Sequence, residues 1–439
     1  MKRDLQLIYF NAGGGHRSAA IALQEVMARS HPEWTVHLIN LFDVIDPEHY
    51  YQKLTGFAPE DLYNLRLKRG WTRSLATELK IFQVMIRLSL PKLKNKLQLF
   101  WQATRPDMVV SLVPNFNKVM YQAVTEALPK VPYVTVITDL ADYPPNFWIE
   151  PGQGQHIICG TEFAASQAMA SGYEQKRITK TSGMILRPSF YRKQEVNRLL
   201  HYKELGLDTE RPTGLVMFGG NGSNEMLKIS KELSAHQLIF ISGHNTDLAK
   251  KIESQTTLAK HVAMGYVKNI DHVMQLSDYF VGKPGPGSLS EAVHMGLPVI
   301  TFRSAATMPQ ERYNTVWVQE NKLGKVIPSV RELRRAVEDL LNDLAVFQLH
   351  VQKINNTAVY EVVEALSRIM HTSSGQVLNS DASKTDALKF NKLDHANFFH
   401  HAVTAVRDIG LVTSVERTHD CSTQENTDRR KRPRRGQSF

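Results

Sequence analysis

Short apolar runs alternate with amphipathic stretches along most of the chain. The runs are rich in Val, Ile, Leu and Phe, which is typical of strands buried on both faces. Between them, segments such as 17–29 and 161–171 have the period of a helix that buries one face. Strands separated by helices predict an α/β protein with parallel sheets. The predicted strands are 5–10, 35–41, 107–113, 132–138, 156–159, 213–218, 237–242, 278–281 and 297–302.

The predicted strands fall into two groups. The segment 187–210 separates them and is polar and rich in Lys, Arg and Tyr, so we predict an interdomain linker there. It divides an N-terminal lobe (1–186) from a C-terminal lobe with closing helices (211–370). We predict two doubly wound, Rossmann-like lobes facing a cleft, with ligands at the carboxyl ends of the strands. Residues 371–439 lack sustained patterns apart from 396–412, which predicts a largely disordered tail with a basic end.

The composition fits this fold class and excludes several others. Hydrophobic residues make up 42% and charged residues 22% of the 439, as in ordinary globular proteins. Two cysteines, Cys159 and Cys421, exclude a disulfide scaffold and a Cys-based zinc site, and favour a reducing compartment. The apolar stretch 5–10 is too short for a signal peptide, and no run approaches the roughly 18 apolar residues of a membrane span. We expect a cytoplasmic protein, soluble or lying on a membrane.

The net charge of +10 is concentrated in two segments. Segment 66–96 holds nine Lys and Arg against one Glu, and its Leu75, Leu79, Phe82 and Ile86 share one helical face. This pattern is typical of a helix at a membrane interface beside anionic headgroups, and equally of a surface helix whose apolar stripe belongs to the core. The last eleven residues carry six Lys and Arg. No aromatic platform or nucleic-acid motif accompanies them, so we expect no specific nucleic-acid partner.

Four loops that follow predicted strands carry candidate chemistry. The first, 11–18, has glycines at 13–15 and then His16 at the start of a helix. Glycines let backbone amides approach a ligand, and a histidine beside the cleft can take a proton near neutral pH. The alternative is a helix-capping histidine after a glycine turn. The loop matches neither the dinucleotide fingerprint nor the phosphate-binding P-loop in full.

The second loop, 218–223, repeats the sequence of strand, glycines and helix in the C-terminal lobe. Gly219 and Gly220 expose backbone amides, and Ser223 adds a hydroxyl. This combination suits phosphate oxygens. The alternative is a glycine-rich turn that binds no ligand.

The third and most specific motif spans 265–298. Its central stretch is 283–292, and Gly265-Tyr266-Val267, Asn269-Ile270-Asp271, Ser277-Asp278 and Gly296-Leu297-Pro298 flank it. The stretch from Gly285 to Ser288 opens a helix whose amino end can hold a diphosphate. Lys283 adds a cation near the phosphates, and Glu291 lies where a carboxylate can accept both hydroxyls of a ribose. Alternatively, Glu291 is a capping glutamate paired with Ser288.

The fourth loop, 308–314, follows the last predicted strand. It places the amide of Gln310 beside the carboxylate of Glu311, and such a pair can bind the hydroxyls of a sugar. Alone, this short string would carry little information.

Together the motifs resemble a family of enzymes. The loop at 11–18 resembles the first loop of the monogalactosyldiacylglycerol synthases and the processive diacylglycerol glucosyltransferases, which are glycosyltransferase family 28-like. It is similar more distantly to the glycosyltransferase that makes lipid II. The resemblance covers about residues 5–370 in the family's order. It continues through Thr138-Asp139-Leu140, Pro145 to Trp148, Arg187 to Phe190, Gly265-Tyr266-Val267 with Asn269-Ile270, Lys283 to Ala292, and Gln310-Glu311 with Asn314.

The resemblance implies a two-lobed glycosyltransferase B fold and a UDP-sugar donor, UDP-galactose or UDP-glucose. It also implies inversion at the anomeric carbon with no cofactor and no metal ion in the chemical step. His16 matches the family's proposed catalytic or acceptor-contacting histidine, and Gly14, Gly15 and Asp139 lie on the acceptor side. The expected donor-binding residues are Gly219, Gly220, Asn221, Lys283, Gly285, Gly287 and Ser288 at the diphosphate, Glu291 at the ribose, Tyr266 and Val267 at the uracil, and Gln310 and Glu311 at the sugar.

Three departures from the family pattern bear on function. Asn-Ala at 11–12 replaces an acid that commonly precedes the glycine loop, which leaves His16 or Asp139 as the base. Met-Pro-Gln-Glu at 308–311 stands where the family has Pro-Gly-Gln-Glu, so the identity of the sugar is open. Tyr-Pro at 143–144 stands near a usual His-Pro pair, which bears on the acceptor.

We therefore expect an inverting glycosyltransferase that moves a hexose from a UDP-sugar to a lipid acceptor, diacylglycerol. It would act peripherally on the inner face of a membrane, held to anionic lipid by segment 66–96. Three alternatives stay open: a transferase with a soluble or polyprenyl acceptor, a UDP-sugar 2-epimerase, and a non-catalytic UDP-sugar sensor.

Overall fold

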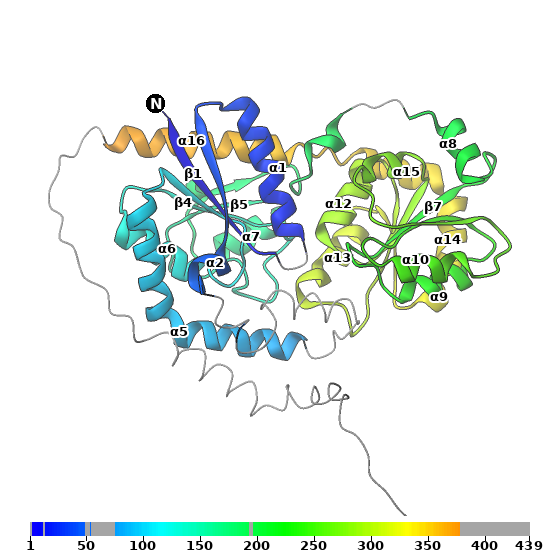
Figure 1. Cartoon of the computed structure of the whole chain (residues 1–439), viewed down its shortest axis with the longest axis horizontal. Coiled ribbons are helices and arrows are strands. Elements are labelled where there is room, and N and C mark those ends of the chain that lie inside the picture. The colour runs from blue at the N-terminus through cyan, green and yellow to red at the C-terminus, as the bar shows by residue number, and fades with distance from the viewer. Residues whose placement is uncertain (1, 12–13, 49–52, 54–74, 193–195, 378–439) are drawn as a thin grey trace, which may run out of the picture. The chain divides into compact units, whose positions relative to one another are not determined.

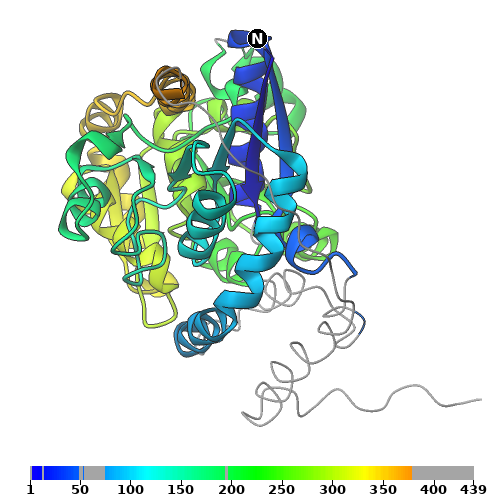
Figure 2. The same cartoon turned by 90° about the vertical axis from the view of Figure 1, so that its left-hand side faces the viewer.

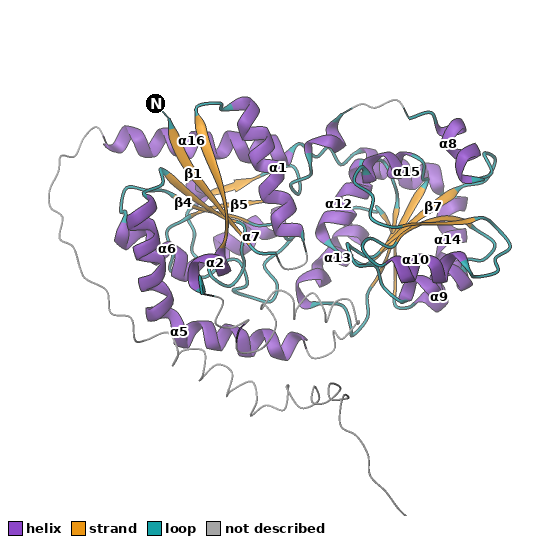
Figure 3. Cartoon of the chain, viewed as in Figure 1, coloured by secondary structure: helices purple, strands orange, loops and turns teal. Residues whose placement is uncertain are grey.

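The computed structural model of the chain describes residues 2–11, 14–48, 53, 75–192 and 196–377, with the backbone alone for 75–89 and 373–377. Both sheets lie in one compact unit, residues 1–385. Figure 3 shows strands flanked by helices in each lobe. Hydrophobic cores cover both faces of each sheet, because successive side chains of a strand point to opposite faces.

The first sheet is parallel, with the order β2-β1-β3-β4-β5-β6. Its direction of growth reverses between β1 and β3, which makes this the place where an open α/β sheet binds ligands. The strands are β1 (Arg3–Tyr9), β2 (Trp34–Asn40), β3 (Met108–Ser111), β4 (Tyr133–Val136), β5 (His156–Cys159) and β6 (Ile178–Lys180). The helices around them are α1 (Gly15–Ser30), α2 (Leu41–Ile45), α5 (Leu75–Thr104), α6 (Asn117–Ala127) and α7 (Glu162–Ala170).

The second sheet is parallel as well, with the order β12-β11-β10-β7-β8-β9. This is the strand order of a dinucleotide-binding Rossmann sheet, and it reverses between β7 and β10. The strands are β7 (Thr213–Met217), β8 (Gln237–Ile241), β9 (His261–Met264), β10 (Tyr279–Gly282), β11 (Val299–Phe302) and β12 (Gly324–Ile327). The helices are α9 (Glu225–Glu232), α10 (Thr246–Glu253), α11 (Ile270–Gln275), α12 (Pro286–His294), α13 (Arg312–Glu320), α14 (Leu333–Asn342) and α15 (Leu344–Gln352).

The predicted fold class is confirmed. Each of the nine predicted strands is present within a few residues of its expected ends. The pattern missed β6, β9 and β12, which lie at sheet edges and are only three or four residues long. An edge strand is less buried and needs no long apolar run, so its signal is weak.

The last described helix, α16 (Ala358–Val377), returns to the first lobe. Its apolar face, including Val359, Val362 and Leu366, joins the core formed by α1 and β1. Figure 1 shows α16 beside α1. The sequence grouped residues up to 370 with the C-terminal lobe, whereas this helix completes the N-terminal one. Nothing in its own pattern says which sheet its apolar face covers.

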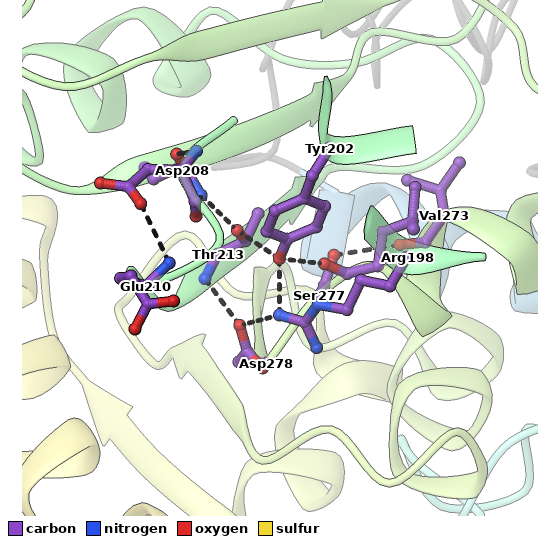
Figure 4. Close-up of polar contacts among 10 residues, drawn as sticks. Arg198, Tyr202, Asp208, Glu210, Thr213, Val273, Ser277 and Asp278 are labelled. Carbon is purple, nitrogen blue, oxygen red and sulfur yellow. Dashed lines mark hydrogen bonds and ion pairs between the residues drawn. The ribbon is translucent and has the colours of Figure 1, made fainter. Parts of the chain in front are cut away.

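Part of the predicted linker is fastened to the second lobe. Helix α8 (Arg198–Leu205) places Tyr202, fully buried, against the second core. Arg198 Nη2 lies 2.7 Å from Asp278 Oδ2, and the Tyr202 hydroxyl lies 2.7 Å from Thr213 Oγ1. Figure 4 shows this network at the starts of β7 and β10. The linking segment proper is therefore shorter than 187–210.

Segment 66–96 is only partly described: 66–74 lies outside the described residues, and the stripe side chains from Leu75 to Ile86 do too. In the described part of α5, Leu93 and Leu97 are buried in a core with α2 and α6. Lys94 pairs with Glu126 at 2.8 Å, and Lys96 donates to a backbone carbonyl. Figure 2 shows α5 alongside the first strands of the sheet, and its buried side chains share a core with Ile8 of β1 and Val109 of β3. These two lysines therefore make contacts within the N-terminal lobe.

Within the described ranges, no helix is both long and apolar enough to cross a bilayer.

Candidate active site

The first half of the site lies where β1 ends and α1 begins. Gly14 caps the helix with φ of 79°, a left-handed conformation that favours glycine. His16 follows in the first turn, half-buried, and its Nδ1 lies 2.9 Å from the Thr138 hydroxyl oxygen. Gly15 opens the helix, while residues 12–13 of the predicted loop lie outside the described residues. The sequence-predicted His16 is therefore held against the segment that follows β4.

Asp139 and Trp148 complete this half. Asp139 is 6% exposed, and its Oδ2 accepts a hydrogen bond of 2.8 Å from the indole nitrogen of Trp148. The Trp148 ring is fully buried, 5.8 Å from the His16 ring between centroids. The Asp142 carboxylate fixes the turn by accepting from the Trp148 backbone at 2.6 Å. The indole thus touches both candidate bases.

The two candidate bases titrate in opposite directions. Burial lowers the pKa of His16 to about 4, and a hydrogen bond with the Leu112 backbone opposes that shift. Burial raises the pKa of Asp139 to about 7, while the Trp148 hydrogen bond works in the other direction. Both shifts disfavour the charged form, as expected for ionisable groups removed from water. Near neutral pH the imidazole is neutral and the carboxyl is poised between its two forms.

The second half of the site is built from glycine loops after β7 and β8. Gly219, Gly222 and Gly243 have φ of 77°, 61° and 61°. A Cβ at Gly243 would lie 2.0 Å from the Gly220 carbonyl oxygen, so a side chain cannot fit there. The His244 amide donates to that same oxygen at 2.9 Å. The two loops therefore pack backbone against backbone, with the half-buried Asn221 between Gly220 and Gly222.

Lys283 connects these loops to the start of α12. Its side chain passes Gly219 and Gly285: a Cβ added at either would lie 3.7 Å or 3.5 Å from Lys283 Cε. Its Nζ lies 2.7 Å from Oε1 of Glu311, a carboxylate that is 5% exposed. The predicted diphosphate and sugar residues are thus adjacent, with the cation between them. Gly287 is exposed in the first turn of α12.

Glu291 does not act as the capping glutamate that the sequence left open. Ser288 Oγ donates to the Gly285 carbonyl at 3.3 Å instead. Burial raises the pKa of Glu291 to about 7, with Arg187 opposing the shift and Asp271 adding to it. Among the described residues, Arg187 Nε and Asp271 Oδ1 are buried without a partner. Sequence reasoning included Asp271 in the third motif but assigned it no role, because a single Asp after Asn-Ile points to no specific chemistry.

The predicted uracil contact lies on the surface of the second lobe. Tyr266 is 62% exposed and stacks on His244 with 4.6 Å between ring centroids. Val267 follows, packed at the edge of the second core. Sequence reasoning missed His244, since no motif surrounds it. Only the position of its loop after β8 could have pointed to this ring as part of the site.

The fourth loop approaches the first lobe. Gln310 is half-buried beside Met308, and Asn314 donates to the Pro284 carbonyl at 2.7 Å, which ties this loop to 283–292. The Tyr313 ring stacks on Phe163 of the first lobe with 4.3 Å between centroids.

Charges from the second lobe reach Asp139. Glu311 raises and Lys283 lowers the pKa of Asp139, so the three groups lie within electrostatic range of one another. The geometry therefore brings the acceptor-side and donor-side predictions together at the carboxyl ends of both sheets. Within the described part of the chain, no group of three or more His, Cys, Asp or Glu side chains could hold a metal ion.

The two sheets and their glycine loops define a protein with two Rossmann-like lobes, the architecture of the glycosyltransferase B fold. Residues 216–369 match the family model described as "Glycosyltransferase family 28 C-terminal domain". The solved structure of CalG4, the calicheamicin glycosyltransferase, superposes with a TM-score of 0.56 at 13% identity, covering 86% of this chain and 99% of that one.

More particularly, the chain is similar to glycolipid enzymes. It is 26% identical over 387 residues to the chloroplastic monogalactosyldiacylglycerol synthase of Spinacia oleracea, covering 83% of this chain and 72% of the relative. It is 24% identical over 300 residues to the processive diacylglycerol beta-glucosyltransferase of Bacillus pumilus, covering 64% and 74%. Among the first curated relatives the match spans 53% to 74% of the relative's length. The family resemblance, and with it the prediction of a glycosyltransferase, is confirmed; the individual residue roles stay predictions.

Proposed function

We propose that the chain transfers a hexose, galactose or glucose, from a UDP-sugar to the hydroxyl of a lipid acceptor, diacylglycerol. The observation that carries the proposal is the Lys283–Glu311 pair at the glycine loops, within electrostatic range of Asp139 in the other lobe. A cation beside glycine-loop amides suits a diphosphate, and a buried carboxyl within its electrostatic range suits proton transfer. The names of the relatives support the lipid acceptor.

The donor would lie along the carboxyl end of the second sheet. The amides at 219–221 and the start of α12 would take the diphosphate, and Glu291 would accept from the ribose hydroxyls. The uracil would lie by Tyr266 and Val267. Gln310 and Glu311 would bind the sugar, and Lys283 would turn from Glu311 toward the phosphates.

The reaction would be a single inverting displacement. The acceptor oxygen attacks the anomeric carbon, the bond from that carbon to the UDP oxygen breaks, and UDP keeps the electron pair. A first-lobe base, His16 or Asp139, takes the hydroxyl proton. Preoriented amides stabilise the charge that develops on UDP, so the chemical step needs no metal ion.

The acceptor would reach the site from a membrane. Segment 66–96 would bind anionic headgroups at the inner face of that membrane, each exposed cation contributing about 1 kcal/mol. Lys92 is exposed and could contact headgroups, whereas Lys94 and Lys96 contact Glu126 and a backbone carbonyl. Membrane contact would therefore rest on Lys92 and on the part of the segment before it.

The test is transfer by the purified full chain. Vesicles of diacylglycerol with anionic phospholipid are incubated with UDP-galactose or UDP-glucose, and the lipids are analysed by mass spectrometry. The proposal predicts a hexosyl-diacylglycerol from one of the donors and none from the Glu311→Gln variant. Sugar transfer only to a soluble or polyprenyl acceptor, conversion of the donor to its epimer, or UDP-sugar binding without turnover would each contradict it.

A further inference from the structure

We propose that Asp139, rather than His16, is the general base, and that Trp148 is the residue that positions its carboxylate. This assignment rests on the proposed function and extends it to the identity of the proton acceptor. His16 then serves as a neutral hydrogen-bonding group at the wall of the site.

The surroundings of Asp139 hold its carboxylate in one orientation. The indole N–H of Trp148 binds Oδ2 at 2.8 Å, and the indole itself is fully buried. Two neighbours fix the Trp148 backbone: Asp142 accepts from its N–H at 2.6 Å, and Asn117 donates to its carbonyl at 3.2 Å. A carboxylate whose supporting donor cannot move is pre-organised for proton transfer.

The surroundings of His16 favour it less as the general base. Its Nδ1 is engaged with the Thr138 hydroxyl of its own lobe at 2.9 Å. A neutral imidazole has one donor and one acceptor nitrogen, so this contact leaves Nε2 as the nitrogen that could take the acceptor proton. Its lowered pKa of about 4, however, makes the imidazole a weak base near neutral pH.

Charged groups of both lobes act on Asp139. Glu311 and Lys283 approach from the second lobe, Asp142 comes from the same loop, and His16 lies across the indole. Glu311 and Asp142 raise the pKa of Asp139, and Lys283 lowers it. With a pKa of about 7, the carboxyl is matched to accept and release a proton under physiological conditions.

The proton balance is simple. The O–H bond of the acceptor breaks, and its proton goes to the Asp139 carboxylate as the oxygen bonds to the anomeric carbon. The bond to UDP breaks with its electron pair on UDP. The neutral carboxylic acid then returns the proton to solvent after product release.

The test is the pH dependence of kcat/KM for the wild type and three variants. The wild type should lose activity on the acid side with an apparent pKa near 7. Asp139→Asn should lower transfer by about two to four orders of magnitude and abolish that acid limb. His16→Gln should lower the rate while keeping the limb, because the base is still present.

Trp148→Phe separates positioning from a structural role. Phenylalanine keeps an aromatic ring, although a smaller one, and the lost N–H should raise the pKa of Asp139 and move the acid limb to higher pH. A residue that only fills space would change stability without moving the limb. UDP titration and thermal melting of each variant show that the chain is folded.

The outcomes distinguish the two proposals. A folded, UDP-binding wild type that transfers no sugar overturns the proposed function and this assignment with it. An active wild type whose Asp139→Asn variant keeps the acid limb, or whose limb vanishes in His16→Gln, overturns the assignment alone.

Discussion

The two lobes carry the same strand–loop–helix unit at their sheets' reversal points but complete it differently. In the second lobe the candidate site is formed mainly by backbone atoms. Gly219, Gly222 and Gly243 adopt left-handed conformations, and the Lys283 side chain passes beside these glycine loops. In the first lobe the surface is side chain, with His16, Asp139 and Trp148 gathered from two loops far apart in sequence. A site made of amides suits a fixed anion, whereas one made of buried ionisable groups suits proton transfer.

The largest expected effect is steric and falls on the backbone-built half. Gly243→Ala would place a Cβ 2.0 Å from the Gly220 carbonyl oxygen at φ of 61°. We expect the free energy of unfolding to fall by about 2–4 kcal/mol, with loss of UDP binding, because both loops must move. Chemical denaturation and UDP titration measure this. Gly172→Ala is the matched control, since its φ is also positive, at 89°, and nothing lies within 4 Å of its added Cβ. If both variants unfold alike, the close loop packing is wrong.

The next effect concerns the ion pair that links the glycine loops to the sugar position. Lys283→Met leaves the buried Glu311 carboxylate without its partner, which should cost about 2–4 kcal/mol of stability. Adding Glu311→Gln should recover most of that stability and none of the transfer activity. A double-mutant cycle in denaturant gives the coupling energy. A single variant as stable as the double variant would show that the pair is not formed.

The difference between the halves explains what the sequence could predict. Glycine motifs such as 283–292 are contiguous in sequence and follow predicted strands, so the donor half could be recognised from the sequence. The alternation of apolar runs predicted nine strands correctly. Trp148 ends the 145–148 motif, which carried no role for it, and His244 belongs to no motif. Only the fold brings these two rings to the site. The sequence likewise could not predict which lobe α16 packs against, because the pattern of an amphipathic helix does not identify the sheet that its apolar face covers.

The first half should show opposite pH effects on stability. Asp139 has a folded pKa of about 7 against an ordinary 3.8, so the folded state binds more protons and stability falls as pH rises between those values. His16 has a folded pKa of about 4 against 6.5, so stability rises with pH in that window. Unfolding free energies at several pH values between 4 and 7 measure both slopes.

Two variants separate these slopes. Relative to the wild type, Asp139→Asn should gain stability as pH rises, and His16→Gln should lose it. The same direction of change in both variants would contradict the opposed titrations.

The smallest effect concerns the aromatic contact between the halves. Phe163 stacks on Tyr313 at 4.3 Å and lies 6.2 Å from Tyr143 between centroids. Phe163→Ala should lower the free energy of unfolding by about 1–2 kcal/mol, while Phe163→Tyr keeps the stacked ring and should change it little. Equal stability of the two variants in denaturant would mean that the stack contributes nothing.

A crystal structure of the chain soaked with UDP tests the central claim most directly. We predict the two phosphoryl groups against the amides of 219–221 and 287–288, with Lys283 turned from Glu311 toward them and Asp139 facing the terminal phosphate. Diphosphate bound elsewhere, or a blocked and empty loop surface at a concentration of UDP that saturates binding in solution, would contradict it.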